Sequence, residues 1–496
     1  MESFLIRALQ LILSLSILVV LHELGHFTFA RLFKVRVEKF YMFFNPNFSL
    51  IRAKKINGKW DFKFLAKNVP ANERQKIDAF GKEVLDAKGK SVMEQIPVAE
   101  LPDADWRKYP ETTEWGIGWL PLGGYCSISG MVDETKDINQ LAAEPQPWEY
   151  RSRSVWQRLP IIIGGVFVNF VLAMVIYSAV LFTWGQEYLP LKNAKYGLNF
   201  SKTLIENGFQ NGDNILKING QPVDRPEDIV EKVLIEGKQN VTVQRENQLV
   251  DITLPKDFSQ KVLAAGEKEF VTVRYPFVIG KISSGSPAEK AKLQTGDSST
   301  GINGKSLTIF QDIANELDAN KGIHINLSFV RHGKAMQSEV QLTDNGKLGV
   351  EVFSPVKFIK VNTIHYSFTQ SIPAGINLGW GKLVNYVKGI KLVFTKEGSK
   401  QVGGFGSMGS LFPPTWNWEA FWSLTALISV ILAFMNLLPI PALDGGYVLF
   451  LIYEMITGKK PSDKFMEYAQ TFGMLLLLGL MLYANGNDIF RHFFNK

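Results

Sequence analysis

Four long apolar segments constrain this chain more than any other feature of its sequence. A helix needs roughly 20 residues to cross about 30 Å of hydrocarbon. The four segments are about that long or longer, and they cover residues 4–33, 158–184, 420–457 and 467–485. The third is overlong and is interrupted by prolines and glycines. The sequence therefore predicts a multi-pass membrane protein with a four-span α-helical membrane core.

Basic residues at the ends of these segments predict their orientation, because Lys and Arg concentrate in cytoplasmic loops. They follow the first segment, precede the second and separate the last two: Arg31, Lys34, Arg36, Lys39, Arg151, Arg153, Arg158, Lys459, Lys460 and Lys464. Both termini and the region between spans two and three then lie on the opposite side, which is the periplasm of a bacterial inner membrane. The lipid bilayer is thus an expected partner.

The formal net charge of +7 is accounted for by these flanks and by a solvated surface. A dense Lys/Arg run with interleaved aromatic residues would indicate a nucleic-acid groove, and the sequence has none. We expect no nucleic-acid partner. The single cysteine, Cys126, excludes an intramolecular disulfide and a multi-cysteine metal site.

A short motif, His22-Glu23-Leu24-Gly25-His26, stands inside the first apolar segment. On a helix its two imidazoles lie one turn apart on the same face, where they can share a metal ion. In metalloproteases with this spacing the histidines bind Zn²⁺ and the glutamate acts as general base. Ionisable groups in hydrocarbon are costly unless they have partners. The motif therefore predicts a zinc site with Glu23 as the catalytic base.

A third metal ligand is expected from elsewhere, since catalytic zinc usually takes three protein ligands. Asp444 is a lone carboxylate in the interrupted third segment, where residues 436–446 read NLLPIPALDGG. Irregular backbone at membrane depth is tolerated only where it is buried in protein or lines a cavity. Asp444 is therefore the predicted third ligand, although an aspartate at this place could also merely cap the helix that follows.

Residues 115–131 predict a membrane-associated β-hairpin. They read WGIGWLPLGGYCSISGM, an apolar run with turns at Pro121 and at Gly123-Gly124. Between spans two and three, residues 212–220 return in weakly similar form as residues 296–304. Each copy precedes a short helical pattern and alternating strands, an order that resembles PDZ domains. Further on, residues 368–394 alternate apolar and Lys positions as an interfacial helix does.

The chain resembles the site-2 protease family, and within it the regulator of sigma-E protease type. Three motifs in the order of that family carry the resemblance: HELGH at 22–26, GGVFVNF at 164–170 and NLLPIPALDGG at 436–446. The second departs slightly, because Gly165 stands where the family more often has proline. Residues of about 55–112 fall outside the resemblance as a longer cytoplasmic insertion.

The resemblance implies an intramembrane zinc endopeptidase that cuts single-span membrane proteins, such as anti-sigma factors, after a first cut by another protease. It assigns the zinc to His22, His26 and Asp444, with the active site toward the cytoplasmic side. It also implies that substrate is bound near Asn436, Gly123, Gly124 and Asn169. The PDZ-like pair would exclude substrates that have not been trimmed.

The predicted organisation has eight parts. They are a first transmembrane helix with HELGH (1–34), a cytoplasmic region with the hairpin (35–150), a second transmembrane helix (151–185), two PDZ-like domains (186–272 and 273–355), an interfacial linker (356–415), a third transmembrane segment (416–458), and a fourth transmembrane helix with the tail (459–496).

Two other functions remain open at the level of the sequence. A catalytically silent scaffold would use the PDZ-like modules to bind partner tails while the polar residues in the spans only pack together. A transporter would also place ionisable residues and broken helices in the membrane, although four spans without a membrane repeat make it a weaker match.

Overall fold

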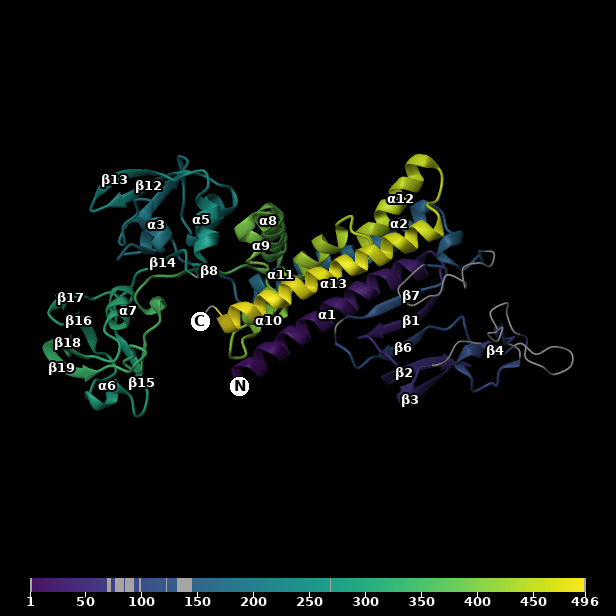
Figure 1. Ribbon diagram of the computed structural model, residues 1–496, viewed down its shortest axis with the longest axis horizontal. Helices are drawn as coiled ribbons and strands as arrows, with labels where there is room; N and C mark the ends of the chain where they lie inside the picture. The colour runs from purple at the N-terminus through teal and green to yellow at the C-terminus, as the bar shows by residue number, and fades with distance from the viewer. Residues whose placement is uncertain are drawn as a thin grey trace. The chain divides into compact units, whose positions relative to one another are not determined.

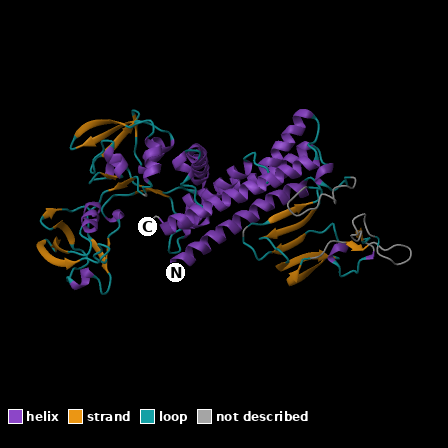
Figure 2. Ribbon diagram, viewed as in Figure 1, coloured by secondary structure: helices purple, strands orange, loops and turns teal. Residues whose placement is uncertain are grey.

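The computed structural model describes residues 2–68, 73–75, 84, 93–97, 100–121, 123–131, 145–267 and 269–494. The chain forms two compact units. The first comprises Met1–Thr183, Ser367–Leu383 and Gly403–Lys496, and the second comprises Trp184–Tyr366 and Val384–Val402. Figure 1 labels the elements, and Figure 2 colours them by type. Most of the long helices belong to the first unit, and short strands dominate the second.

Four helices in the described part of the chain are long and apolar enough to cross a membrane. All belong to the first unit: α1 (Glu2–Leu32), α2 (Val155–Thr183), α11 (Trp418–Leu437) and α13 (Asp463–Phe494). Both α1 and α11 pack along α2. Much of the apolar surface of α13 is exposed, as at Leu475 and Leu482, which suits a helix that faces lipid.

The third apolar segment is broken, as its prolines predict. The helix α11 ends at Leu437, and α12 (Asp444–Thr457) begins after six irregular residues. Pro439 and Pro441 cannot donate backbone hydrogen bonds, and Ala442 adopts a left-handed φ of 75°. The Ala442 N–H donates to Gln470 Oε1 of α13 at 2.8 Å. The freed backbone is therefore satisfied inside the protein.

Between α1 and α2 the first unit forms a five-stranded sheet in the order β3-β2-β6-β1-β7. Its strands are β1 (Val37–Met42), β2 (Phe48–Ile56), β3 (Lys59–Lys67), β6 (Glu114–Ile117) and β7 (Tyr125–Ile128); β4 (Glu73–Gln75) and β5 (Met93–Gln95) pair separately.

The predicted hairpin within 115–131 is wrong. Its two strands, β6 and β7, do not pair with each other, because β1 lies between them; Phe40 of β1 faces Trp115 on one side and Cys126 on the other. At the end of β1, the Gly118 N–H, just after β6, donates to the Met42 carbonyl. Val37, Phe40 and Tyr41 are buried, so β1 takes the inner position.

Amphipathic residues 368–394 form a helix as predicted, α8 (Phe368–Val393), and the boundary between the two units falls within it. Two short helices follow, α9 (Lys396–Ser399) and α10 (Phe405–Ser410). Gly375 lies so close to α2 that a Cβ there would stand 2.3 Å from Ser178 Oγ. The first part of α8 is thus packed on a spanning helix.

The second unit contains two β-rich modules with the same strand order, β11-β10-β12-β13 and β17-β16-β18-β19. The first has β9 (Leu198–Phe200), β10 (Asn214–Ile218), β11 (Gln221–Pro222), β12 (Asn240–Arg245), β13 (Gln248–Thr253), β14 (Val271–Val273), α3 (Lys202–Glu206), α4 (Pro226–Val230) and α5 (Phe258–Ala265). The second has β15 (Ile279–Ile282), β16 (Ser298–Ile302), β17 (Lys305–Ser306), β18 (His324–Arg331), β19 (Lys334–Gln341), β20 (Val350–Val352), α6 (Pro287–Lys290) and α7 (Phe310–Ala319).

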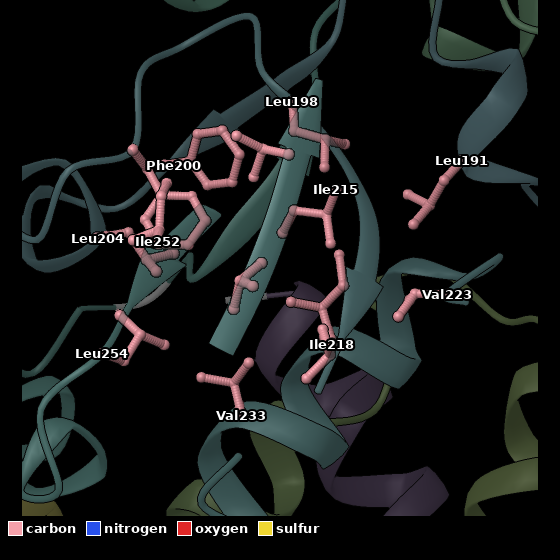
Figure 3. Packing of buried hydrophobic residues seen from close by; sticks show 14 of the residues in the cluster. Leu191, Leu198, Phe200, Leu204, Ile215, Ile218, Val223, Val233, Ile252 and Leu254 are labelled. Carbon is pink, nitrogen blue, oxygen red and sulfur yellow. The ribbon is translucent and has the colours of Figure 1, made fainter. Parts of the chain in front are cut away.

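The sequence repeat corresponds to repeated structure. Each module has its own apolar core. Figure 3 shows the core of the first module, to which Ile215 and Ile218 of β10 and Val233 belong. A buried aspartate pairs with an arginine in both copies: Asp213 with Arg245 at 2.8 Å, and Asp297 with Arg331 at 2.7 Å. The chain enters and leaves the pair of modules through β8 (Gln186–Tyr188) and β21 (Asn362–Ile364), which pair antiparallel.

Candidate metal centre

The helix α1 carries the predicted zinc motif in one unbroken stretch. His22 and His26 project from the same face, and their Nε2 atoms are 3.2 Å apart, with ring planes at 82°. Both side chains are largely buried against α2, at 12% and 10% exposure. The spacing of four residues therefore produces the paired imidazoles that the sequence predicts.

Asp444 meets these imidazoles from the first residue of α12. Its Oδ2 is 3.2 Å from His22 Nε2 and 3.5 Å from His26 Nε2. The N-cap position of α12 is taken by Leu443, and Asp444 is the first residue inside the helix, so Asp444 is not the N-cap residue of the alternative interpretation. The structure brings the three predicted ligands together across more than 400 residues of sequence.

The three atoms fit one tetrahedral zinc ion. Ligand distances of about 2.0–2.2 Å place neighbouring ligand atoms about 3.3 Å apart, close to the separations found here. Asp444 Oδ2 is buried without a hydrogen-bond donor among the described residues, and a buried carboxylate needs a compensating cation. Two imidazole nitrogens and a carboxylate oxygen are ligands that zinc commonly takes.

Backbone and amide groups on α2 hold the two imidazoles. His26 Nδ1 is 2.9 Å from the Ile161 carbonyl oxygen, so it donates there and leaves Nε2 as the ligand atom. His22 Nδ1 is 3.3 Å from the side-chain amide of Asn169, whose own oxygen has no partner in the described chain. A metal-binding His22 carries its proton on Nδ1, and the amide accepts it when Oδ1 faces the ring.

Glycines allow α1 and α2 to approach each other closely beside the metal cluster. A Cβ at Gly25 would lie 2.3 Å from the Gly164 carbonyl oxygen. A Cβ at Gly165 would lie 2.5 Å from His26 Nε2 and 2.6 Å from His22 Cε1. Gly165, the residue that departs from the family's second-span motif, therefore lies directly beside the imidazoles. Its backbone leaves no space there for a side chain.

Glu23 follows His22 on α1 and is half-buried. The backbone N–H of Cys126, in strand β7, donates a hydrogen bond to its carboxylate. The edge strand of the sheet thus fixes the carboxylate beside the two imidazoles. A carboxylate held next to a metal position is suited to accept a proton from water.

The other predicted site residues have different surroundings. Asn436 is half-buried near the end of α11, and no hydrogen bond joins it to the cluster within the described residues. Gly124 passes so close to the sheet and α1 that a Cβ would lie 2.6 Å from the Tyr41 carbonyl oxygen. A Cβ at Gly123 would lie 2.8 Å from the Phe44 ring. Both glycines therefore have a packing role.

Two supporting groups were missed in the sequence. The Ile161 carbonyl carries no sequence signal, because every residue has one. Gln470 holds the broken segment through Ala442, and a lone amide within an apolar helix was a signal that could have indicated it. These groups position the ligands without being ligands themselves.

Paired helical imidazoles, a carboxylate from a broken helix and a neighbouring glutamate, all carried by apolar helices, define a membrane zinc metalloprotease. The model of peptidase family M50 matches residues 10–67 and 97–480. The chain belongs to this family, the site-2 proteases, as the three motifs predict. The unmatched residues between these ranges are fewer than the predicted insertion of 55–112, because β2 and β3 belong to the matched sheet.

Individual relatives agree with the family. A Clostridium acetobutylicum protein named as a zinc metalloprotease is 26% identical over 480 residues, which are 96% of each chain. The regulator of sigma E protease of Haemophilus influenzae is 26% identical over 407 residues, 76% of this chain and 87% of the relative. A Neisseria meningitidis protein named as a zinc metalloprotease is 26% identical over 405 residues, 76% of this chain and 88% of the relative.

Proposed function

We propose that this metalloprotease is an intramembrane endopeptidase that cleaves single-span membrane proteins, such as anti-sigma factors, after another protease has shortened them. One observation carries the proposal, which is the place of the metal cluster in the fold. His22, Glu23 and His26 lie on α1, which is long and apolar enough to cross a membrane, and Asp444 begins the helix that follows another such helix, α11. The name of the Haemophilus relative supports a substrate in a sigma-factor pathway.

His22, His26 and Asp444 hold the zinc, and Glu23 acts as the general base. Bound zinc supplies a Lewis acid that activates water for attack on a peptide carbonyl. Glu23 accepts a proton during this attack and delivers it to the leaving amine. The Cys126 N–H keeps the Glu23 carboxylate in place, and the Ile161 carbonyl and Asn169 amide keep both imidazoles oriented.

A transmembrane substrate must lose its helical hydrogen bonds before a peptide bond reaches this site. The strand β7 is at one edge of the five-stranded sheet, and it contacts α1. An opened segment of substrate adds to this edge as an extended strand, next to Glu23. Asn436, at the end of α11, binds the substrate backbone, and Gly123 and Gly124 shape the approach to β7.

The modules of the second unit are PDZ-like and act as a size filter. In the proposed orientation they lie in the periplasm, while the basic flanks of the spans face the cytoplasm of a bacterial inner membrane. Their repeated sheets and independent cores suit folded domains that stand outside the bilayer. A scaffold or a transporter would not need the zinc-fitting cluster that the structure contains.

The direct test compares wild type with Glu23→Gln, which leaves all three ligands unchanged. We expect one zinc per chain in both proteins, and cleavage of a tagged single-span substrate to fall by about 10²–10⁴-fold in the variant, the usual contribution of a general base. The measurement pairs metal analysis with a gel assay in detergent or vesicles. Equal cleavage by both proteins would overturn the role of Glu23, and cleavage of only soluble peptides would overturn the intramembrane assignment.

A further inference from the structure

A pocket separate from the metal cluster opens at one end of the spanning helices. Its volume is about 250 Å³, and none of the three zinc ligands lines it. The lining comes from the segment before α2, the first turn of α2, the middle of α12, the loop that follows α12 and the start of α13. The volume is below the roughly 300–1,000 Å³ of pockets that enclose a whole drug-sized ligand. The pocket thus suits one part of a larger molecule.

Positive charge dominates the polar side of this pocket. Arg151, Arg158 and Lys460 line it, together with a single carboxylate, Glu454. Arg158 is 6% exposed, donates from Nη2 to Glu454 Oε1 at 2.5 Å and from Nε to the Arg153 carbonyl at 3.0 Å. Its Nη1 makes no hydrogen bond to any described residue. The guanidinium therefore keeps donors for a ligand after its ion pair is formed.

A buried hydroxyl in the same lining lacks a partner. Tyr150 is 7% exposed, and within the described chain its Oη has no hydrogen bond. Its ring lies 5.8 Å from the Arg158 guanidinium. Burial raises the pKa of the Tyr150 phenol, so the hydroxyl stays protonated and acts as a donor. An unpaired buried donor is costly, and an acceptor bound in the pocket would remove that cost.

The rest of the lining from α12 and α13 is largely apolar. It includes Tyr447, Phe450 and Leu451 of α12 and Met466 of α13. Donors for an anion therefore share one pocket with apolar side chains at the end of membrane-spanning helices. A free phosphate ion would use only the polar side, whereas a phospholipid would use both. Basic pockets between helices on the cytoplasmic side are typical sites for anionic lipid headgroups.

We infer that this pocket binds the phosphate headgroup of an anionic glycerophospholipid. Tyr150 Oη and the guanidinium of Arg158 donate to phosphate oxygens, Lys460 adds charge at the rim, and the acyl chains follow the apolar lining from α12 and α13. The site does not depend on the protease reaction, because none of its residues is a zinc ligand or the general base.

The test measures lipid binding by the full chain in neutral detergent, by native mass spectrometry. Phosphatidylglycerol and phosphatidylcholine with the same acyl chains are compared, and inorganic phosphate is added as a competitor. We expect one phosphatidylglycerol to bind with preference over phosphatidylcholine, and millimolar phosphate to compete poorly. Equal binding of the two lipids would overturn the anionic-headgroup site, and displacement by phosphate alone would assign the pocket to a free anion instead.

Two variants with matched controls locate the binding. Tyr150→Phe removes only a hydroxyl that has no hydrogen-bond partner among the described residues, so it should fold normally and bind phosphatidylglycerol about tenfold more weakly. Tyr177→Phe, which removes another buried hydroxyl outside the pocket, should bind as wild type. Lys460→Gln should weaken binding about fivefold, and Lys459→Gln, which is next in sequence but outside the lining, should weaken it less. Unchanged binding by Tyr150→Phe would overturn the proposal.

Discussion

At the scale of the residue, the site depends on groups that orient ligands. His22 and His26 can bind one zinc only if both present Nε2, and this requires partners at both Nδ1 atoms. The Ile161 carbonyl provides one partner and the Asn169 amide the other. Asn169, which the family resemblance places near bound substrate, has its amide 3.3 Å from His22 Nδ1. Its proposed role is therefore positioning.

Replacing Asn169 tests this role. Asn169→Ala removes the side-chain amide that lies 3.3 Å from His22 Nδ1 and should lower zinc affinity by about 10–100-fold. Asn169→Asp retains an acceptor oxygen and should bind zinc much more tightly than Asn169→Ala does. Competition with a chelator gives both affinities without an activity assay. Equal zinc affinity in wild type and Asn169→Ala would contradict the role.

Gly165 gives a second prediction at the same scale. A Cβ at this position would lie 2.5 Å from His26 Nε2, so Gly165→Ala must displace an imidazole or separate the helices. A displacement of about 1 Å can cost about 100-fold in rate, and we expect kcat/KM to fall by that order. The control is Gly479→Ala in α13, where a Cβ would meet nothing within 4 Å. A fully active Gly165→Ala protein would show that the helices adjust without cost.

At the scale of the element, the break between α11 and α12 determines where Asp444 lies. Prolines end α11, and the left-handed Ala442 turns the chain so that α12 starts with Asp444 against α1. The acidic first residue also suits the N-terminus of a helix, whose dipole favours negative charge. Contact with α13 holds this segment, since a Cβ at Gly473 would lie 1.9 Å from the Pro441 carbonyl oxygen.

Gln470 tests whether α13 holds the break. Gln470→Leu leaves the Ala442 N–H without its acceptor, which costs about 1–3 kcal/mol for a buried donor. We expect a lower Tm and weaker zinc binding, because Asp444 follows two residues later. Thr471→Leu, an adjacent exposed residue on α13, should change neither. If Gln470→Leu matched Thr471→Leu in both measurements, the hydrogen bond would not secure the metal centre.

At the scale of the whole molecule, the two β-rich modules of the second unit form an insertion with adjacent ends. Strands β8 and β21 pair directly, with Tyr188 opposite Asn362. The modules between them have separate cores and repeated ion pairs. The two modules can therefore be deleted and the chain rejoined at the end of the two-stranded ribbon that β8 and β21 form.

The size-filter proposal predicts the effect of that removal. Replacing residues 189–361 by Asn-Gly closes the ribbon with a two-residue turn that suits hairpins. We expect the shortened protein to retain one zinc and to cleave trimmed and untrimmed substrates at similar rates. Wild type should cleave only the trimmed form. Continued discrimination by a zinc-loaded deletion protein would show that the filter lies elsewhere.

The sequence alone determined the parts of this protein whose physics is local. Apolar length predicts the spanning helices, helical periodicity pairs His22 with His26, and prolines predict the break before Asp444. The tertiary structure decided what depends on distant segments meeting. It placed β1 between β6 and β7 where a hairpin was expected, because pairing partners depend on packing. It also supplied the Ile161 carbonyl, the Asn169 amide and the Gln470 contact, since an orienting hydrogen bond exists only once two elements have packed together.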